Sequence, residues 1–276
     1  MAKLEDSGFL SIGAQRLEYR FIGPRPGEAP TLVMLHEGLG CVGMWGDFPD
    51  RLQKATGCGV FVCSREGYGQ SSPAKLPRPL SFMHSEARET LPKILETIGF
   101  QHGLLVGHSD GASIAAIYAG SHQDHRVAGI VLMAPHFIVE DVTIASIAEM
   151  RKAYDTADLR ARLARYHADV DATVHGWSDV WLKGDFRKWD LTEFLAYIRV
   201  PVLIVQGEGD QYGTVRQIEI AQAECYCPVE VALLPGAKHV PQREAPEATM
   251  MAVTEFVARV LENEMAGAGP AITTPR

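Results

Sequence analysis

A serine framed by two glycines is the best candidate for a nucleophile in this sequence. Ser109 lies in the pentapeptide GHSDG at 107–111, after the apolar run 104–106 and before the small-residue helical pattern 112–119. Where a strand turns directly into a helix, a serine is held in strained backbone geometry with its hydroxyl exposed, and flanking glycines let the two elements approach closely. Free N–H groups at the helix start stabilise developing negative charge. The pattern predicts a nucleophile elbow; a glycine-rich turn is the alternative.

A serine hydroxyl needs a general base within hydrogen-bond reach, and the base needs a carboxylate to orient it. Among the ten histidines, His239 has the best position, because it follows the last predicted strand in a glycine loop before the final helix. Asp210 directly follows another predicted strand, after Gly207 and Gly209; a solvated turn aspartate is its alternative interpretation. We therefore predict that Ser109, Asp210 and His239 act together in nucleophilic catalysis.

Three other histidines lie close to these loops. His36 and His108 flank the loops, and we expect them to brace the loops by hydrogen bonds. His136 follows the strand predicted at 127–133 and could reach a pocket at the strand ends.

Apolar runs and helical patterns alternate along most of the chain. Buried strands are predicted at 31–35, 59–63 and 104–106, further strands at 127–133, 201–205 and 229–234, and an N-terminal hairpin at 9–12 and 16–22. Helices are predicted at 45–56, 82–98, 112–119, 215–224 and 246–264. This alternation predicts an α/β protein with a mostly parallel sheet covered by helices on both faces. Ligands of such sheets bind at the carboxyl ends of the strands, where the glycine loops lie.

The alternation stops between residues 138 and 198. This stretch has amphipathic helical pattern and contains Trp177, Trp181 and Trp189. We interpret residues 138–198 as a helical cap inserted into a core formed by 1–137 and 199–276. The tryptophans either line a pocket or pack the cap onto the core, and packing is the expectation for most of them. The tail 265–276, rich in Ala, Gly, Pro and Thr, is expected to be disordered.

Composition excludes several classes of partner. The chain has 276 residues, 46% of them hydrophobic, and a formal charge of −8, so no basic stripe is present to bind nucleic acid or an anionic membrane. Five cysteines without framework spacing favour a reduced, cytoplasmic setting, and no apolar run is long enough to span a membrane. Neither a metal nor another cofactor is expected.

Five motifs together resemble the α/β-hydrolase superfamily, specifically its capped, cytoplasmic bacterial esterase-like members. The resemblance covers about residues 9–262, and its motifs are HEGLG at 36–40, REGYGQS at 65–71, GHSDG at 107–111, GEGD at 207–210 and GAKH at 236–239. It implies an oxyanion hole formed by the backbone N–H groups of Gly38 and Asp110, with Leu39 as second choice to Gly38. Glu37 departs from the family, most of whose members have glycine there.

The resemblance implies a serine hydrolase that cleaves carboxylic esters of small, largely apolar or aromatic compounds through an acyl-enzyme. A carbon–carbon bond hydrolase of ring-cleavage products, a lactonase, an acyltransferase or a perhydrolase would share the triad. A ligand-binding protein with a lid is the non-enzymatic alternative, and a homo-oligomer is left open. For the Asp110 carboxylate we favour capping of the following helix over a role in specificity. The Glu37 side chain is expected to line the pocket entrance or to pair with an arginine such as Arg65.

Overall fold

The computed structural model describes residues 4–156 and 158–265, in which eight strands form one sheet. The strands are β1 (Ser7–Ile12), β2 (Gln15–Ile22), β3 (Thr31–Leu35), β4 (Gly59–Cys63), β5 (Gly103–His108), β6 (Val127–Met133), β7 (Val202–Gly207) and β8 (Val229–Leu234). Their order in the sheet is β1-β2-β4-β3-β5-β6-β7-β8. The β1–β2 and β2–β4 pairs are antiparallel, and the other pairs are parallel. The predicted α/β class with a mostly parallel sheet is confirmed.

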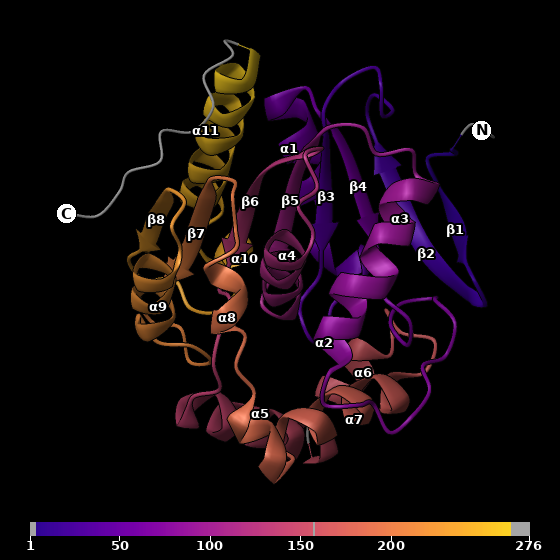
Figure 1. Cartoon of the computed structure of the whole chain (residues 1–276). Helices are drawn as coiled ribbons and strands as arrows, with labels where there is room; N and C mark the ends of the chain where they lie inside the picture. The colour runs from indigo at the N-terminus through magenta and orange to yellow at the C-terminus, as the bar shows by residue number, and fades with distance from the viewer. Residues whose placement is uncertain (1–3, 157, 266–276) are drawn as a thin grey trace.

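The central strands consist of continuous apolar runs, because helices cover both faces of the sheet and both sides of each central strand are buried. Every residue of β3, β4, β5 and β6 is buried, whereas β2 alternates between buried and partly exposed positions. Helices α1 (Phe48–Thr56) and α11 (Pro246–Met265) pack on one face. Helices α3 (Leu91–Thr97), α4 (Asp110–Ser121) and α9 (Arg216–Glu224) pack on the other, and Figure 1 shows α3 and α4 in front of the sheet.

The helix predicted at 82–98 contains an irregular turn. It consists of α2 (Phe82–Ser85), a π-helical turn at Glu86–Thr90, and α3. Pro92 lies in the first turn of α3; its ring has no N–H to donate and would clash with the carbonyl four residues earlier, which favours a wider turn just before it. The helix predicted at 45–56 is likewise divided, into a 3-10 turn (Val42–Trp45) and α1, because Gly46 has a φ of 62°.

In the described residues, four α-helices and a 3-10 turn connect β6 to β7. They are α5 (Asp141–Thr156), α6 (Leu159–Leu163), α7 (Val170–Trp181), the 3-10 turn η3 (Gly184–Lys188) and α8 (Thr192–Leu195). In Figure 1, α5, α6 and α7 lie below the sheet. Helix α8 packs instead on α4: a Cβ placed on Gly120 would come within 2.2 Å of the Phe194 carbonyl oxygen.

The two ends of the predicted 138–198 insertion therefore lie in different surroundings. Helix α5 lies below the sheet, whereas α8 packs on α4, which covers one face of the sheet. Trp177, Trp181 and Trp189 are all buried, as expected for packing side chains. At the C-terminus, Met265 is the last residue of α11, and the rest of the predicted disordered tail lies outside the described residues. No helix in the described part of the chain is long and apolar enough to cross a bilayer.

Candidate functional site

The turn from β5 into α4 has the geometry expected of a nucleophile elbow. Ser109 has φ 52° and ψ −117°, a strained conformation for a residue with a side chain, and is 4% exposed. A Cβ on Gly107 would lie 2.3 Å from the Gly111 carbonyl oxygen, and one on Gly111 would lie 2.0 Å from that of Leu35. Backbone contact between strand and helix therefore requires glycine at both positions.

The three residues predicted to act together form one hydrogen-bonded chain. His239 Nε2 lies 2.9 Å from Ser109 Oγ, and His239 Nδ1 lies 2.9 and 3.0 Å from the two carboxylate oxygens of Asp210. Asp210 Oδ1 also accepts the backbone N–H groups of Tyr212 and Gly213, at 2.8 and 3.2 Å.

Burial acts to raise the pKa of Asp210, but the hydrogen bond and charge of His239 and the Tyr212 N–H outweigh it, so this pKa is lowered from its usual value. An ionised Asp210 requires the proton of a neutral His239 to be on Nδ1. The Nε2 atom can then accept the hydroxyl proton of Ser109.

The two predicted oxyanion donors are free of other protein partners. Within residues 4–156 and 158–265, the backbone N–H groups of Gly38 and Asp110 donate to no other protein group. Gly38 lies directly against the side chain of Trp177 from α7, since a Cβ on Gly38 would come within 2.2 Å of the indole nitrogen. The loop can therefore approach α7 this closely only with glycine at this position.

The Asp110 side chain does not cap its helix, so that prediction is wrong. Its Oδ2 accepts the indole N–H of Trp177 at 2.9 Å and lies 4.0 Å from Arg65 Nη2, and the carboxylate accepts no N–H of α4. The carboxylate turns away from its helix because an aromatic donor and a cation lie on the other side. Oδ1 is buried without a partner among the described residues. Burial raises the pKa of Asp110, with Arg65 and Trp177 acting in the opposite direction.

The Glu37 carboxylate faces His108 rather than Arg65, with 3.5 Å between Glu37 Oε2 and His108 Nδ1. Burial acts to raise its pKa, but the contact with His108 outweighs burial and holds the pKa at about 2. Arg65 contacts the Glu37 main chain instead, donating from Nη2 to the carbonyl oxygen at 3.1 Å. The expected pairing of the two side chains is therefore wrong.

His36 and His108 brace the loops, as predicted. His36 Nε2 accepts the Arg65 backbone N–H at 3.0 Å, and Nδ1 lies 2.7 Å from the Glu37 carbonyl oxygen. Burial, followed by the charge of Arg65, lowers the pKa of His36 well below its usual value, so it is a neutral brace. His108 Nε2 lies 2.8 Å from the His239 carbonyl oxygen.

His136 lies beside the triad, 5.6 Å from His239 between ring centroids. Burial, followed by the nearby His239, lowers its pKa to about 3, so His136 is neutral at physiological pH. Its ring also packs edge-on against Trp181, at 5.2 Å. The expectation that His136 reaches the strand-end site is consistent with this placement.

Three residues that sequence reasoning did not assign to the site bind its loops together. Arg65 lies in the REGYGQS motif, and the partner suggested for it, the Glu37 carboxylate, is not the group to which its guanidinium donates. Trp177 bonds to Asp110. His167, between α6 and α7, accepts the Gly69 N–H at 2.9 Å, and its Nε2 lies 3.0 Å from the Leu39 carbonyl oxygen. Trp177 and His167 contact loops that are distant from them in sequence, so the local sequence pattern did not indicate these contacts.

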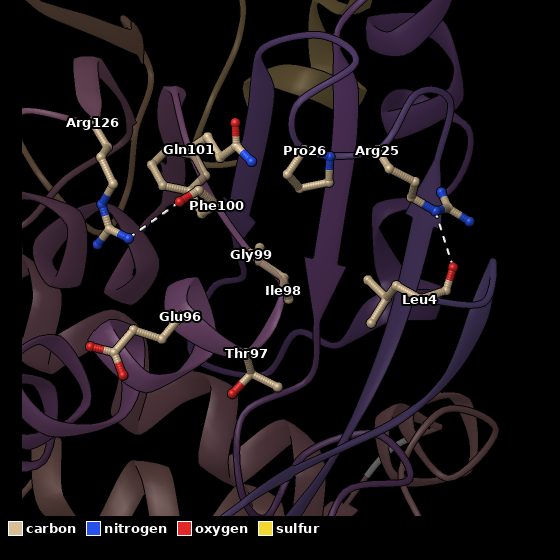
Figure 2. A pocket seen from close by; sticks show the side chains of 10 residues that line it. All are labelled: Leu4, Arg25, Pro26, Glu96, Thr97, Ile98, Gly99, Phe100, Gln101 and Arg126. Carbon is tan, nitrogen blue, oxygen red and sulfur yellow. Dashed lines mark hydrogen bonds between the residues drawn. The ribbon is translucent and has the colours of Figure 1, made fainter. Parts of the chain in front are cut away.

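A separate open groove of about 520 Å³ lies near the amino ends of the parallel strands, as Figure 2 shows. Its lining includes Arg25 and Arg126, but both arginines already have acidic partners, Asp6 at 2.5 Å and Asp124 at 2.7 Å. The triad lies at the opposite, carboxyl ends of the strands. This groove therefore has no direct part in the chemistry of Ser109.

Comparison with known proteins is consistent with the fold. The human "(Lyso)-N-acylphosphatidylethanolamine lipase" is 30% identical over 114 residues, which are 41% of this chain and 32% of that protein. The chain thus spans about a third of the length of this curated relative.

Two solved structures are similar over most of both chains. The enol-lactonase from Burkholderia xenovorans LB400 has a TM-score of 0.71 and 21% identity, covering 91% of this chain and 100% of its own. The esterase RhEst1 from Rhodococcus sp. ECU1013 has a TM-score of 0.70 and 18% identity, covering 93% and 100%. At these identities the likeness shows the fold alone.

The model of the family described as "alpha/beta hydrolase fold" matches residues 30–180, which include β3, the elbow and all but the last residue of α7. This chain belongs to the alpha/beta hydrolase fold family.

Proposed function

We propose that this protein is a serine hydrolase that cleaves carboxylic esters through an acyl-enzyme. The observation that carries the proposal is the hydrogen-bonded chain from Ser109 through His239 to Asp210, with all three His239 contacts at 2.9–3.0 Å. Along the chain, the nucleophile, the orienting carboxylate and the general base occur in the order known for this fold.

In the proposed reaction, Ser109 Oγ attacks the carbonyl carbon of the ester while His239 Nε2 takes the hydroxyl proton. The carbonyl oxygen becomes an oxyanion, which accepts hydrogen bonds from the backbone N–H groups of Gly38 and Asp110. As the tetrahedral intermediate collapses, the bond to the alkoxy group breaks and His239 returns the proton to that leaving group. Water then attacks the acyl-enzyme with His239 as base, releasing the acid and restoring Ser109. Every proton transfer uses His239, so the proposal requires no cofactor.

The surroundings of the triad support a small substrate with apolar or aromatic parts. Trp177 contacts Gly38, one of the proposed oxyanion donors, and Trp181 packs on His136 beside the triad. Planar apolar side chains favour apolar and aromatic ligands. The relatives named above as a lipase, an enol-lactonase and an esterase have names that indicate ester or lactone chemistry, which supports the same class here.

A fluorophosphonate probe and a panel of p-nitrophenyl esters test the proposal. We expect the probe to label Ser109, and Ser109→Ala to abolish labelling and to lower ester turnover by at least about 10⁴-fold. Ser121→Ala is the matched control, because Ser121 lies at the far end of the same helix and its hydroxyl donates to the Ile117 carbonyl. Turnover unchanged in Ser109→Ala would overturn the nucleophile assignment, and binding of esters without turnover by the wild type would indicate a ligand-binding protein.

A further inference from the structure

Arg65 is a buried arginine whose donors are directed mainly at main-chain atoms. It follows β4 by two residues and is 4% exposed. Its Nη1 donates to the carbonyl oxygen of His36, and its Nη2 to that of Glu37 at 3.1 Å. Its own backbone N–H donates to His36 Nε2 at 3.0 Å. One residue thus holds both carbonyls that directly precede Gly38.

The Glu37 carbonyl and the Gly38 N–H belong to the same peptide group. That group is planar and trans, so its N–H points away from its carbonyl oxygen. The Glu37 oxygen also accepts the Gly40 N–H at 3.1 Å and lies 2.7 Å from His36 Nδ1, so the guanidinium is the charged member of three groups that fix the direction of the Gly38 N–H. A cationic donor on the carbonyl also polarises the amide, which makes the N–H a stronger hydrogen-bond donor.

Arg65 is connected to the other proposed oxyanion donor as well. Its Nη2 lies 4.0 Å from Oδ2 of Asp110, whose carboxylate is fully buried. The Tyr68 ring packs against the guanidinium, 4.9 Å from its central carbon to the ring centroid. A buried guanidinium with an anion on one side and an aromatic ring on another has little freedom to turn.

We propose that Arg65 is the positioning residue of the oxyanion hole: it orients and polarises the Gly38 N–H through the Glu37 carbonyl and holds that loop in register with Asp110. This inference rests on the proposed function. Lysine is not an equivalent replacement, because its ammonium donates from a single nitrogen and lacks the planar fork whose two nitrogens contact the two carbonyl oxygens.

The test compares Arg65→Lys and Arg65→Gln with Arg126→Lys. Arg126 is a matched control, because its guanidinium donates to the carbonyl of Phe100 at 3.2 Å and pairs with Asp124 at the other end of the sheet. For both Arg65 variants we expect kcat on a p-nitrophenyl ester to fall about 10- to 100-fold, below the full loss of an oxyanion donor. KM should stay within about threefold, and the Ki of phenylboronic acid, which forms a tetrahedral adduct on serine, should rise in parallel with the loss of kcat.

The pH midpoint of kcat/KM should not move in the Arg65 variants, because the contacts between His239 and Asp210 are unchanged. A kcat within twofold of Arg126→Lys, or a rise of KM alone, would overturn the inference. Wild-type protein provides a measurement that needs no folded variant: phenylboronic acid should shift the Gly38 amide proton downfield in a ¹H–¹⁵N spectrum. An unmoved Gly38 resonance at saturating boronate would also overturn it, whereas wild-type protein with no ester turnover would overturn the proposed function instead.

Discussion

The two ends of the central sheet treat their buried polar groups differently. At the carboxyl end, a carboxylate oxygen of Asp110 and ring nitrogens of His136 and Trp181 are buried without partners among the described residues, whereas near the amino end the neutral hydroxyl of Thr31 is also unpaired. At the amino end, the groove of Figure 2 is open, yet its two arginines each hold an acidic partner. By its volume alone, the groove would be chosen as the functional site. The unpaired buried groups favour the site around the triad instead.

This difference has a physical meaning, because leaving a buried polar atom unpaired costs about 1–3 kcal/mol. Proteins tolerate that cost mainly where a ligand, water or reacting group completes the hydrogen bonds. Arg65 and Arg126 make the same contrast: Arg126 neutralises Asp124 near the surface, whereas Arg65 gives two donors to the carbonyls of one loop. The comparison predicts large effects on activity at one end and negligible effects at the other.

The largest effect is expected for Asp210→Asn. The amide presents an N–H₂ group or a neutral oxygen to His239, which removes the charge that stabilises the imidazolium and favours the wrong tautomer. We expect kcat to fall about 10⁴-fold with the fold intact. Steady-state ester kinetics at pH 7.5 measure it, and Glu208→Gln, an exposed neutral substitution in the same loop, is the control. Activity within tenfold of the wild type in Asp210→Asn would remove Asp210 from the triad.

A smaller effect, on the free energy of unfolding, is expected for Trp177→Phe. Phenylalanine keeps an aromatic ring but leaves the Asp110 carboxylate without its indole donor, since Trp177 Nε1 donates to Asp110 Oδ2 at 2.9 Å. Trp189→Phe is the matched control, because the Trp189 indole nitrogen is buried without a partner in the described chain. We expect the free energy of unfolding to fall by about 1–3 kcal/mol more for Trp177→Phe in urea titrations. Equal losses would show that the hydrogen bond contributes nothing.

A third prediction concerns pH and the same carboxylate. Burial raises the pKa of Asp110 in the folded protein, so its contribution to stability is present at acidic pH and is lost as pH rises through that folded pKa. Asp110→Asn removes the ionisation and keeps an oxygen for Trp177. The Tm of Asp110→Asn minus that of the wild type should therefore be larger at pH 7.5 than at pH 4.5. A difference that shrinks with rising pH would mean that Arg65 stabilises the charge more than burial opposes it.

Sequence reasoning located the catalytic loops better than the contacts around them. The runs 31–35, 59–63 and 127–133 became strands with the predicted bounds, because fully buried parallel strands consist of continuous apolar residues. The run 229–234 also became a strand with the predicted bounds, although β8 lies at the edge of the sheet and is largely exposed. Ser109, Asp210 and His239 were found because strand ends and glycine loops are local signals. The partners of Asp110 were missed, since Trp177 comes from a helix 67 residues away in sequence. Side-chain direction at a helix start depends on such neighbours more than on capping propensity.

The smallest effect is expected at the groove. Thr97 is exposed on the last turn of α3 and lies in the lining of the groove, where Figure 2 shows its side chain. Thr97→Trp would place a large ring there, yet exposed substitutions away from special features usually change stability by less than about 0.5 kcal/mol. We expect kcat/KM for p-nitrophenyl esters to stay within about twofold of the wild type. A tenfold loss of kcat/KM would show that a change at the amino end of the sheet affects the triad. A groove whose arginines are already paired would then influence a reaction at the opposite strand ends, and the contrast between the two ends would not hold.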